Sequence, residues 1–265
     1  MTNAIALNAT LFNLATVVGP TVAGLTYAAF GAAWCFGLNG VSFLGVITAL
    51  LLMRLPVRII APSTRSALAD LKEGLRYTIS HPLLRALIAV PAVTALFGMA
   101  YATLLPAWAV EVLEGDATTN GLLQSARGAG SLLGALMIAA LAHHGRRGCW
   151  LTIGMVAYPL LLLCFSLMRW VPLAMLVLVG VGWGGVVLFN SANTLVQSHV
   201  SDALRGRVMA IFSLTFFGGM PLGALWAGPL ADYVGAPLTL VVSSGILLGF
   251  ALLFWLFAPH VRRLT

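Results

Sequence analysis

The amino-acid sequence predicts an all-α fold, a polytopic membrane bundle of about eight transmembrane helices. Hydrophobic residues make up 60% of the 265 residues and charged residues only 8%, whereas soluble domains carry about 25% charged residues. The apolar residues form runs of about 20 or more, the length that a helix needs to cross a hydrocarbon core of about 30 Å. Basic residues lie almost entirely on one side of these runs, as expected of an inserted helical bundle.

The spans are predicted in chain order, and all but one of the connections between them are short. Short connections make neighbouring helices antiparallel, so the runs predict a bundle that crosses the bilayer back and forth. The predicted spans are Ile5–Ala29, Ala33–Met53, Ala86–Val110, Asn120–Ala142, Cys149–Met168, Pro172–Val196, Val208–Ala231 and Pro237–Ala258.

The charge distribution predicts which way the bundle is inserted. With the C-terminus in the cytoplasm, every one of the 14 basic residues except Arg127 and Arg169 falls on the cytoplasmic side. Four acidic residues fall on the outer side, namely Glu111, Glu114, Asp116 and Asp232. The sequence therefore predicts a multi-pass protein of the inner (plasma) membrane with both termini in the cytoplasm.

The one long polar connection, residues 54–85, divides the chain into a unit of two helices (1–53) and a unit of six (86–265). Four apolar residues at helical spacing face away from four charged ones, which predicts an amphipathic helix lying at the membrane surface and ending at His81-Pro82. The apolar residues are Leu68, Leu71, Leu75 and Ile79, and the charged ones are Asp70, Lys72, Glu73 and Arg76.

Several other function classes find no support in the sequence. The net charge of +7 could suggest a nucleic-acid partner, but the basic residues sit in short loops and no binding motif accompanies them, so no nucleic acid is predicted. No signature of a metalloprotease, serine hydrolase or P-loop nucleotide site is found, and no enzyme activity or cofactor is predicted. Cys35, Cys149 and Cys164 are isolated, which predicts neither a disulfide nor a metal site.

Glycine spacing predicts close helix packing and an internal repeat. Pairs four residues apart, which let helix backbones approach each other in a membrane, occur at Gly130 and Gly134, Gly180 and Gly184, and Gly219 and Gly223. At a constant offset of 204 residues, glycines of the first two spans align with glycines of the last two. This repeat indicates two halves of six helices related by a parallel repeat, with the first half incomplete in this sequence.

Three stretches resemble the major facilitator superfamily. Asn3 to Asn8, Gly19-Pro20 with Gly24, and Gly31-Ala-Ala-Trp34 resemble helix five and the start of helix six of an exporter of that superfamily. Gln197 with Leu204-Arg-Gly-Arg-Val-Met209 resembles the end of helix ten and the loop that follows it. Pro221-Leu-Gly223, Gly228-Pro-Leu-Ala-Asp232 and Gly235-Ala236 resemble helix eleven. The resemblance is to the efflux branch that contains macrolide and enterobactin exporters.

The resemblance implies secondary active efflux of an amphipathic small molecule, drug-like or siderophore-like, by alternating access. The implied partners are the lipid bilayer, the substrate and a coupling proton, while the oligomeric state stays open. Members of the family have twelve helices and this sequence matches from about helix five onward. An alternative is therefore a truncated membrane protein that does not transport, or a subunit whose partner supplies the missing helices.

Arg127 is the foremost candidate for a substrate contact. It lies within a predicted span, where an ionised side chain costs at least about 2.5 kcal/mol. It either faces an aqueous cavity and pairs with an anionic substrate or a carboxylate, or it reaches the outer headgroups or a neighbouring helix without contacting substrate. Gln124, one turn earlier, extends the polar surface, as Asn8 and Asn13 do from the first span.

Asn190, Asn193 and Gln197 share one face of a single span. Such a face either lines the cavity or forms hydrogen bonds between helices. The resemblance favours lining, because helix ten borders the cavity in the family.

The remaining candidates are conformational. Gly19 and Pro20, with Gly24, are interpreted as a helix kink that shapes the interface between halves, or as a passive bend. Arg205 and Arg207 flank Gly206 in a cytoplasmic loop, where they anchor the topology or form a salt-bridge gate. Arg146 and Arg147 belong to a basic loop that resembles a family motif but lacks its aspartate. Trp108, Trp150 and Trp170 are interpreted as an interfacial belt.

Overall fold

The computed structural model describes residues 19, 22–23, 26–27, 29–53, 67–141, 147–258 and 261. These residues form helices and no strands. In chain order they are α2 (Ala32–Leu52), α3 (Ala67–Ser80), α4 (Pro82–Val93), η1 (Thr94–Gly98), α5 (Tyr101–Ala107), η2 (Trp108–Val112), α6 (Ala117–Ala140), α7 (Arg147–Ser166), α8 (Val171–His199), α9 (Asp202–Val234) and α10 (Ala236–Phe257).

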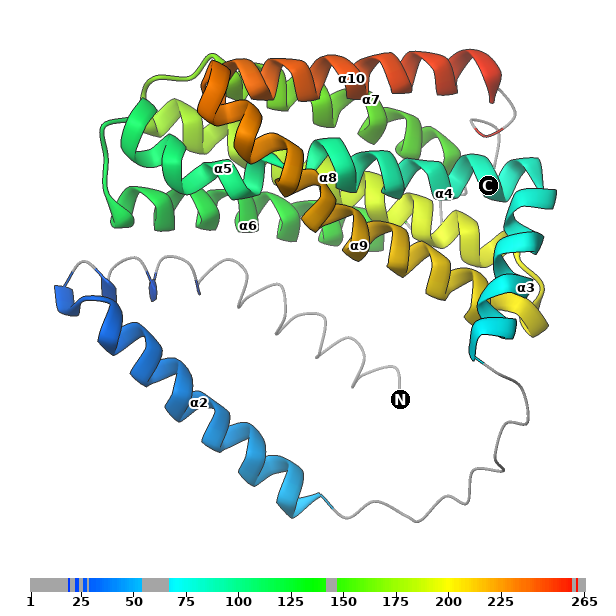
Figure 1. The fold of residues 1–265 in the computed structure, drawn as a ribbon, viewed down its shortest axis with the longest axis horizontal. Coiled ribbons are helices and arrows are strands. Elements are labelled where there is room, and N and C mark those ends of the chain that lie inside the picture. The colour runs from blue at the N-terminus through cyan, green and yellow to red at the C-terminus, as the bar shows by residue number, and fades with distance from the viewer. Residues whose placement is uncertain are drawn as a thin grey trace.

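The predicted membrane bundle is confirmed. Seven helices of the described residues are long and apolar enough to cross a bilayer, and they coincide with the second to eighth predicted spans. The first predicted span, Ile5–Ala29, lies mainly outside the described residues. In Figure 1 the helices after α3 pack side by side into one bundle, and α3 runs across the end of that bundle.

Helix α2 stands apart from this bundle. Figure 1 shows it separated from the packed helices, and none of its residues is buried. Its 21 residues include exposed Phe36, Phe43 and Leu51. In a soluble protein such a helix would be an aggregation hazard, but a helix of this length and composition is suited to a lipid environment.

The closest packing in the bundle joins α6 to α8 through glycine. A methyl group added to Gly182 would lie 2.0 Å from the carbonyl oxygen of Arg127, and one added to Gly130 would lie 1.8 Å from that of Val179. Both neighbours are backbone atoms, which cannot rotate away. The absence of a side chain at these two positions therefore sets the distance between the helices and holds the backbone of Arg127 against α8.

The first span of the six-helix unit is broken, although the sequence predicts a continuous run from Ala86 to Val110. Two π-helical segments, η1 and η2, interrupt it, with a turn at Met99–Ala100 between η1 and α5. Pro91 precedes η1 and Pro106 precedes η2. Proline removes one backbone donor and pushes away the carbonyl one turn earlier, which accounts for the altered hydrogen-bonding pattern.

Three neighbouring helices hold the broken segment by side-chain hydrogen bonds to consecutive carbonyl groups. The indole Nε1 of Trp226 donates to Leu96 O at 2.8 Å, and Ser243 Oγ donates to Phe97 O at 2.8 Å. The hydroxyl of Tyr158 donates to Gly98 O, also at 2.8 Å. Trp226, Ser243 and Tyr158 belong to α9, α10 and α7, so carbonyls released by the break are satisfied from three directions.

The prediction that Trp108 belongs to an interfacial belt is wrong. Its ring is fully buried and stacks on Phe165 at 4.8 Å between ring centroids, with the Arg169 guanidinium 5.7 Å from the Trp108 ring. The π-helical turn η2 starts at Trp108. Trp170, by contrast, is 67% exposed, as a belt residue would be.

Candidate functional site

A cavity of about 310 Å³ lies within the helical bundle, at the lower end of the usual range for ligand pockets. Its wall comes from every spanning helix of the six-helix unit except α10, including the broken first span. The lining includes Thr94, Tyr101, Arg127, Ser131, Tyr158, Phe189, Phe216 and Phe217.

Arg127 supplies the positive charge of the cavity. It is the eleventh residue of α6, so it lies about 15 Å along the helix, deep within the span. The side chain is half-buried and its Nε atom is buried without a hydrogen-bond partner. Tyr101 also lines the cavity, and its hydroxyl interacts electrostatically with the guanidinium. The structure thus brings Arg127 to a cavity.

Polar residues continue along the same face of α6. Asn120, Gln124, Arg127 and Ser131 follow at spacings of four, three and four residues, which places them on one face. Asn120 Oδ1 and Gln124 Oε1 are buried without hydrogen-bond partners. The Ser131 hydroxyl donates to Arg127 O at 3.1 Å, which closes the row at the cavity.

The start of α6 is held by a capping box. Thr119 N donates to Asp116 Oδ1 at 3.0 Å, and Asp116 N donates to Thr119 Oγ1. The backbone hydrogen bond from Thr119 lowers the pKa of the Asp116 carboxyl below its usual value. Because Asp116 sits outside the span, this charged cap fixes where α6 begins and so where Arg127 lies in the bilayer.

Part of the cavity lining is aromatic. Phe189 of α8 lies 4.4 Å from Phe216 of α9 between ring centroids, and Phe216 lies 5.3 Å from Phe217 in an edge-on arrangement. Phe217 is 66% exposed, so the aromatic surface is not consumed by packing inside the chain. The cavity therefore pairs one cation with an extended apolar wall.

The predicted polar face of α8 lies elsewhere. Gln197 Nε2 donates to Asn193 Oδ1 at 2.6 Å, so two of the three residues satisfy each other. Asn190 is half-buried, and its carbonyl accepts the Thr194 hydroxyl. None of the three lines the cavity of Arg127, which α8 borders only as far as Phe189. The structure does not bring Asn190, Asn193 and Gln197 together with Arg127.

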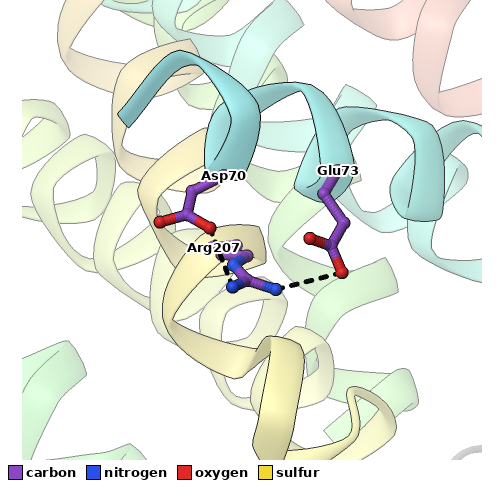
Figure 2. Close-up of polar contacts among 3 residues, drawn as sticks. All are labelled: Asp70, Glu73 and Arg207. Atoms are coloured by element: carbon purple, nitrogen blue, oxygen red, sulfur yellow. Dashed lines mark ion pairs between the residues drawn. The ribbon is translucent and has the colours of Figure 1, made fainter. Parts of the chain in front are cut away.

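Arg205, Gly206 and Arg207 lie in the first turns of α9, so the prediction of a loop is wrong here. Arg205 pairs with Asp202 on the same helix. Arg207 pairs with two carboxylates of α3, at 2.8 Å to Asp70 Oδ1 and 3.1 Å to Glu73 Oε1 (Figure 2). The residues after Arg207 belong to the same long apolar helix, so the helix includes the arginines and begins before them.

Gly74 lets α3 approach the arginine closely. A methyl group added there would lie 3.0 Å from Arg207 Cβ and 3.2 Å from its carbonyl oxygen. The leucine face of α3 points away from this contact, because Leu68, Leu71, Leu75 and Ile79 are all exposed. The acidic face of the helix therefore binds α9 and its apolar face is free to meet other surfaces.

Reversing the charge of Arg207 is expected to weaken the contact between α3 and α9. Arg207→Glu places three carboxylates together, and Asp70→Lys with Glu73→Lys in the same chain restores the attraction. The side chains are 25–48% exposed, so the coupling energy is expected to be about 1 kcal/mol. Thermal unfolding in lipid nanodiscs measures it as a double-mutant cycle of the unaltered chain, Arg207→Glu, the Asp70→Lys and Glu73→Lys pair, and the combined variant.

Arg205→Glu is the matched control for this cycle. Its partner Asp202 is 88% exposed on the same helix, so the substitution is expected to leave the contact with α3 unchanged. Equal destabilisation by Arg205→Glu and Arg207→Glu would contradict a specific contact at Arg207.

Some of the other predicted site residues are described by the structure and some are not. Asn8, Asn13, Pro20, Gly24 and Arg146 lie outside the described residues. Gly19 and Gly206 are described, and nothing lies within 4 Å of a methyl group added to either. Arg147 begins α7 and lines a separate cavity of about 70 Å³ with Trp150 and Thr194.

Sequence reasoning missed the aromatic members of the site. Tyr101 and Tyr158 are almost fully buried, and each has a hydroxyl at the cavity or at the broken segment. A buried tyrosine hydroxyl usually has a polar partner. Two tyrosines deep within predicted spans were a usable signal of a polar site.

The chain is similar in sequence to known export proteins. A family model described as transmembrane secretion effector matches residues 1–263. A multidrug efflux pump, Tap, of Mycolicibacterium fortuitum is 29% identical over 262 residues, which cover 96% of this chain and 62% of the pump. The enterobactin exporter EntS of Escherichia coli O81 (strain ED1a) is 30% identical over 241 residues, covering 91% of this chain and 56% of the exporter. The chain thus spans about three fifths of the length of these relatives.

Proposed function

Since the chain belongs to the transmembrane secretion effector family of the major facilitator superfamily, we propose that it exports an amphipathic small molecule by alternating access. The observation that carries this proposal is a cavity whose lining combines Arg127 with three phenylalanines. The substrate class follows from this pairing of a polar group with an apolar wall. The relatives named as a multidrug pump and an enterobactin exporter support a drug-like or siderophore-like molecule.

Alternating access requires helices that bend or rock, and the broken first span suits this role. Its π-helical segment η1 contributes Thr94 to the cavity wall, while three outer helices hold its carbonyls. π-helical turns occur frequently at functional sites. Bending at Met99–Ala100 would change the cavity without breaking the packing of α6 against α8.

The orientation that we propose has both termini in the cytoplasm of a cell with an inner (plasma) membrane. Arg147, Arg205 and Arg207 start α7 or α9 at the end of the bundle where α3 lies (Figure 1). Glu114, Asp116 and Asp232 lie at the opposite end. This asymmetry agrees with the excess of basic residues in cytoplasmic segments of membrane proteins.

The energy source in this proposal is a proton gradient. None of the chain's seven acidic residues lies in the middle of a span, so the proton-binding group is expected outside this sequence or at the ends of the helices. Proton coupling would then link this chain to helices corresponding to the part of the relatives that it does not match.

A second candidate function is a subunit whose partner supplies further helices. The observation that favours it is α2, a spanning helix with no buried residue among its 21. Against lipid alone such a helix is tolerated, but in a transporter of two halves it would pack against neighbours. The partner in this reading packs against α2.

Transport by the purified chain distinguishes the two candidates. The chain is reconstituted alone into proteoliposomes, and luminal accumulation of ethidium or enterobactin is followed under an imposed pH gradient. The exporter predicts accumulation above that of protein-free liposomes, abolished by a protonophore. Accumulation equal to that of protein-free liposomes for both probes contradicts transport by the chain alone and favours the subunit.

A further inference from the structure

Among the residues that the structure describes, no carboxylate forms an ion pair with Arg127. Where the structure describes the residues, its ion pairs join Arg205 to Asp202 and Arg207 to Asp70 and Glu73. The seven acidic residues of the whole sequence all lie outside the middle of the spans. An ionised arginine deep in a span costs at least about 2.5 kcal/mol. A bound anion would compensate this cost at the moment of binding.

The neighbours of Arg127 leave hydrogen-bonding capacity for such an anion. The guanidinium has five N–H donors in a planar fork that matches a carboxylate, and its Nε is buried without a partner. Tyr101 lines the same cavity and adds a hydroxyl that can donate a hydrogen bond to an anion.

The aromatic part of the cavity lining indicates the chemistry of the rest of the ligand. Phe189, Phe216 and Phe217 form a run of ring contacts at 4.4 and 5.3 Å between centroids. Aromatic rings accept an apolar or aromatic body by stacking or edge-on contact. A small inorganic anion would leave this surface unused, and a neutral apolar molecule would leave Arg127 uncompensated.

We infer that the cavity selects amphipathic organic anions, with the anionic group bound at Arg127 and Tyr101 and the apolar body against Phe189, Phe216 and Phe217. This inference rests on the proposed export function and narrows its substrate class. Cations are repelled by the same arginine, so the site discriminates by charge as well as by shape.

Binding of a matched pair of dyes to the purified chain tests the inference separately from transport. The anionic probe is N-dansylglycine and the neutral probe is its amide, which has the same ring system. Both are titrated by fluorescence into the chain in nanodiscs of zwitterionic lipid. We expect the anion to bind at least tenfold more tightly than the amide.

Arg127→Gln is expected to remove this preference. The anionic dye should bind at least tenfold more weakly to this variant, and the affinity for the amide should be unchanged. Arg127→Lys keeps the positive charge but lacks the planar guanidinium, and it is expected to lose only part of the preference. Tyr101→Phe is expected to lower the affinity for the anionic dye several-fold and to leave the affinity for the amide unchanged. Arg85→Gln removes one charge from an exposed position at the start of α4 and serves as the control.

Three results would overturn the inference. The first is equal binding of the two dyes to the unaltered chain, and the second is an anion preference that survives Arg127→Gln in a protein with normal thermal unfolding. The third is failure of both dyes to bind, because every residue of the proposed site belongs to this chain. Each of these leaves the export function standing if reconstituted transport of ethidium is observed.

Discussion

Replacing Gly182 by alanine is expected to destabilise the protein by about 3 kcal/mol or more. The added methyl group would lie 2.0 Å from Arg127 O and 3.0 Å from Ser131 N, both backbone atoms of α6. No side-chain rotation relieves the overlap, so α6 and α8 must separate. The substitution also moves Arg127 relative to the phenylalanines of the cavity. We therefore expect the variant to lose anion binding as well as stability. Thermal unfolding of the chain in nanodiscs measures the first effect.

Gly245→Ala provides the matched control for this substitution. Gly245 lies in the spanning helix α10, is exposed, and has nothing within 4 Å of an added methyl group. Alanine is a better helix former than glycine by up to about 1 kcal/mol. The control is therefore expected to be neutral or slightly stabilising. A Gly182 variant as stable as the Gly245 variant would contradict the close packing of α6 and α8.

Replacing Tyr158 by phenylalanine is expected to cost about 1–3 kcal/mol of stability. Tyr158 is 1% exposed and its hydroxyl donates to Gly98 O at 2.8 Å. The substitution keeps the ring and leaves the buried carbonyl of the broken segment without its donor. The loss should also alter transport more than ligand binding, because the hydroxyl holds the segment that we propose to bend.

Tyr233→Phe tests whether the effect comes from the buried hydrogen bond. Tyr233 is 92% exposed, so removal of its hydroxyl is expected to change stability by less than about 0.5 kcal/mol. The unfolding temperatures of the two variants and of the unaltered chain are compared in the same lipid. Equal temperatures for the Tyr158 and Tyr233 variants would show that the hydrogen bond to Gly98 contributes nothing measurable.

The bundle itself could be predicted from the sequence because hydrocarbon imposes one requirement on every spanning segment. Each needs about 20 apolar residues in a helix that satisfies its own backbone, and seven of the predicted spans coincide with helices of the structure. The glycine pair of α6, Gly130 and Gly134, also predicted close packing and lies against α8, whereas Gly182 belongs to no predicted pair. Pro91 and Pro106 were visible in the sequence, but two prolines do not show whether a helix will kink or form π-helical turns.

Of the residues that line the cavity, only Arg127 could be predicted from the sequence. Arg127 stands out because a cation in a span has a large cost, and the structure places it at the cavity. Asn190, Asn193 and Gln197 were expected there on helical spacing, which shows that residues share a face but not which neighbour that face meets. The partners of Arg207 on α3 could not be predicted either, because an ion pair between residues 70 and 207 depends on tertiary packing.

The location of the ion pair at the junction of α3 and α9 has a consequence for the transport cycle. Helix α3 continues through His81 into α4, the start of the broken span. Arg207 therefore ties the beginning of α9 to the segment that leads into the proposed bend (Figure 2). In the proposed cycle this contact keeps the cytoplasmic ends of α4 and α9 together while the middle of the first span changes shape.

Cysteine accessibility in the cavity tests most directly whether the site around Arg127 is an alternately accessible substrate site. Ser131→Cys is introduced at the cavity wall of a chain in which Cys35, Cys149 and Cys164 are replaced by serine. Ser244→Cys, at a fully buried position of α10, is the control. A membrane-impermeant maleimide is added to intact cells and, separately, to inverted membrane vesicles. We predict that the cysteine at position 131 reacts from both sides and that the one at position 244 reacts from neither. Reaction at position 131 from neither side, or from one side only, would contradict alternating access at this cavity.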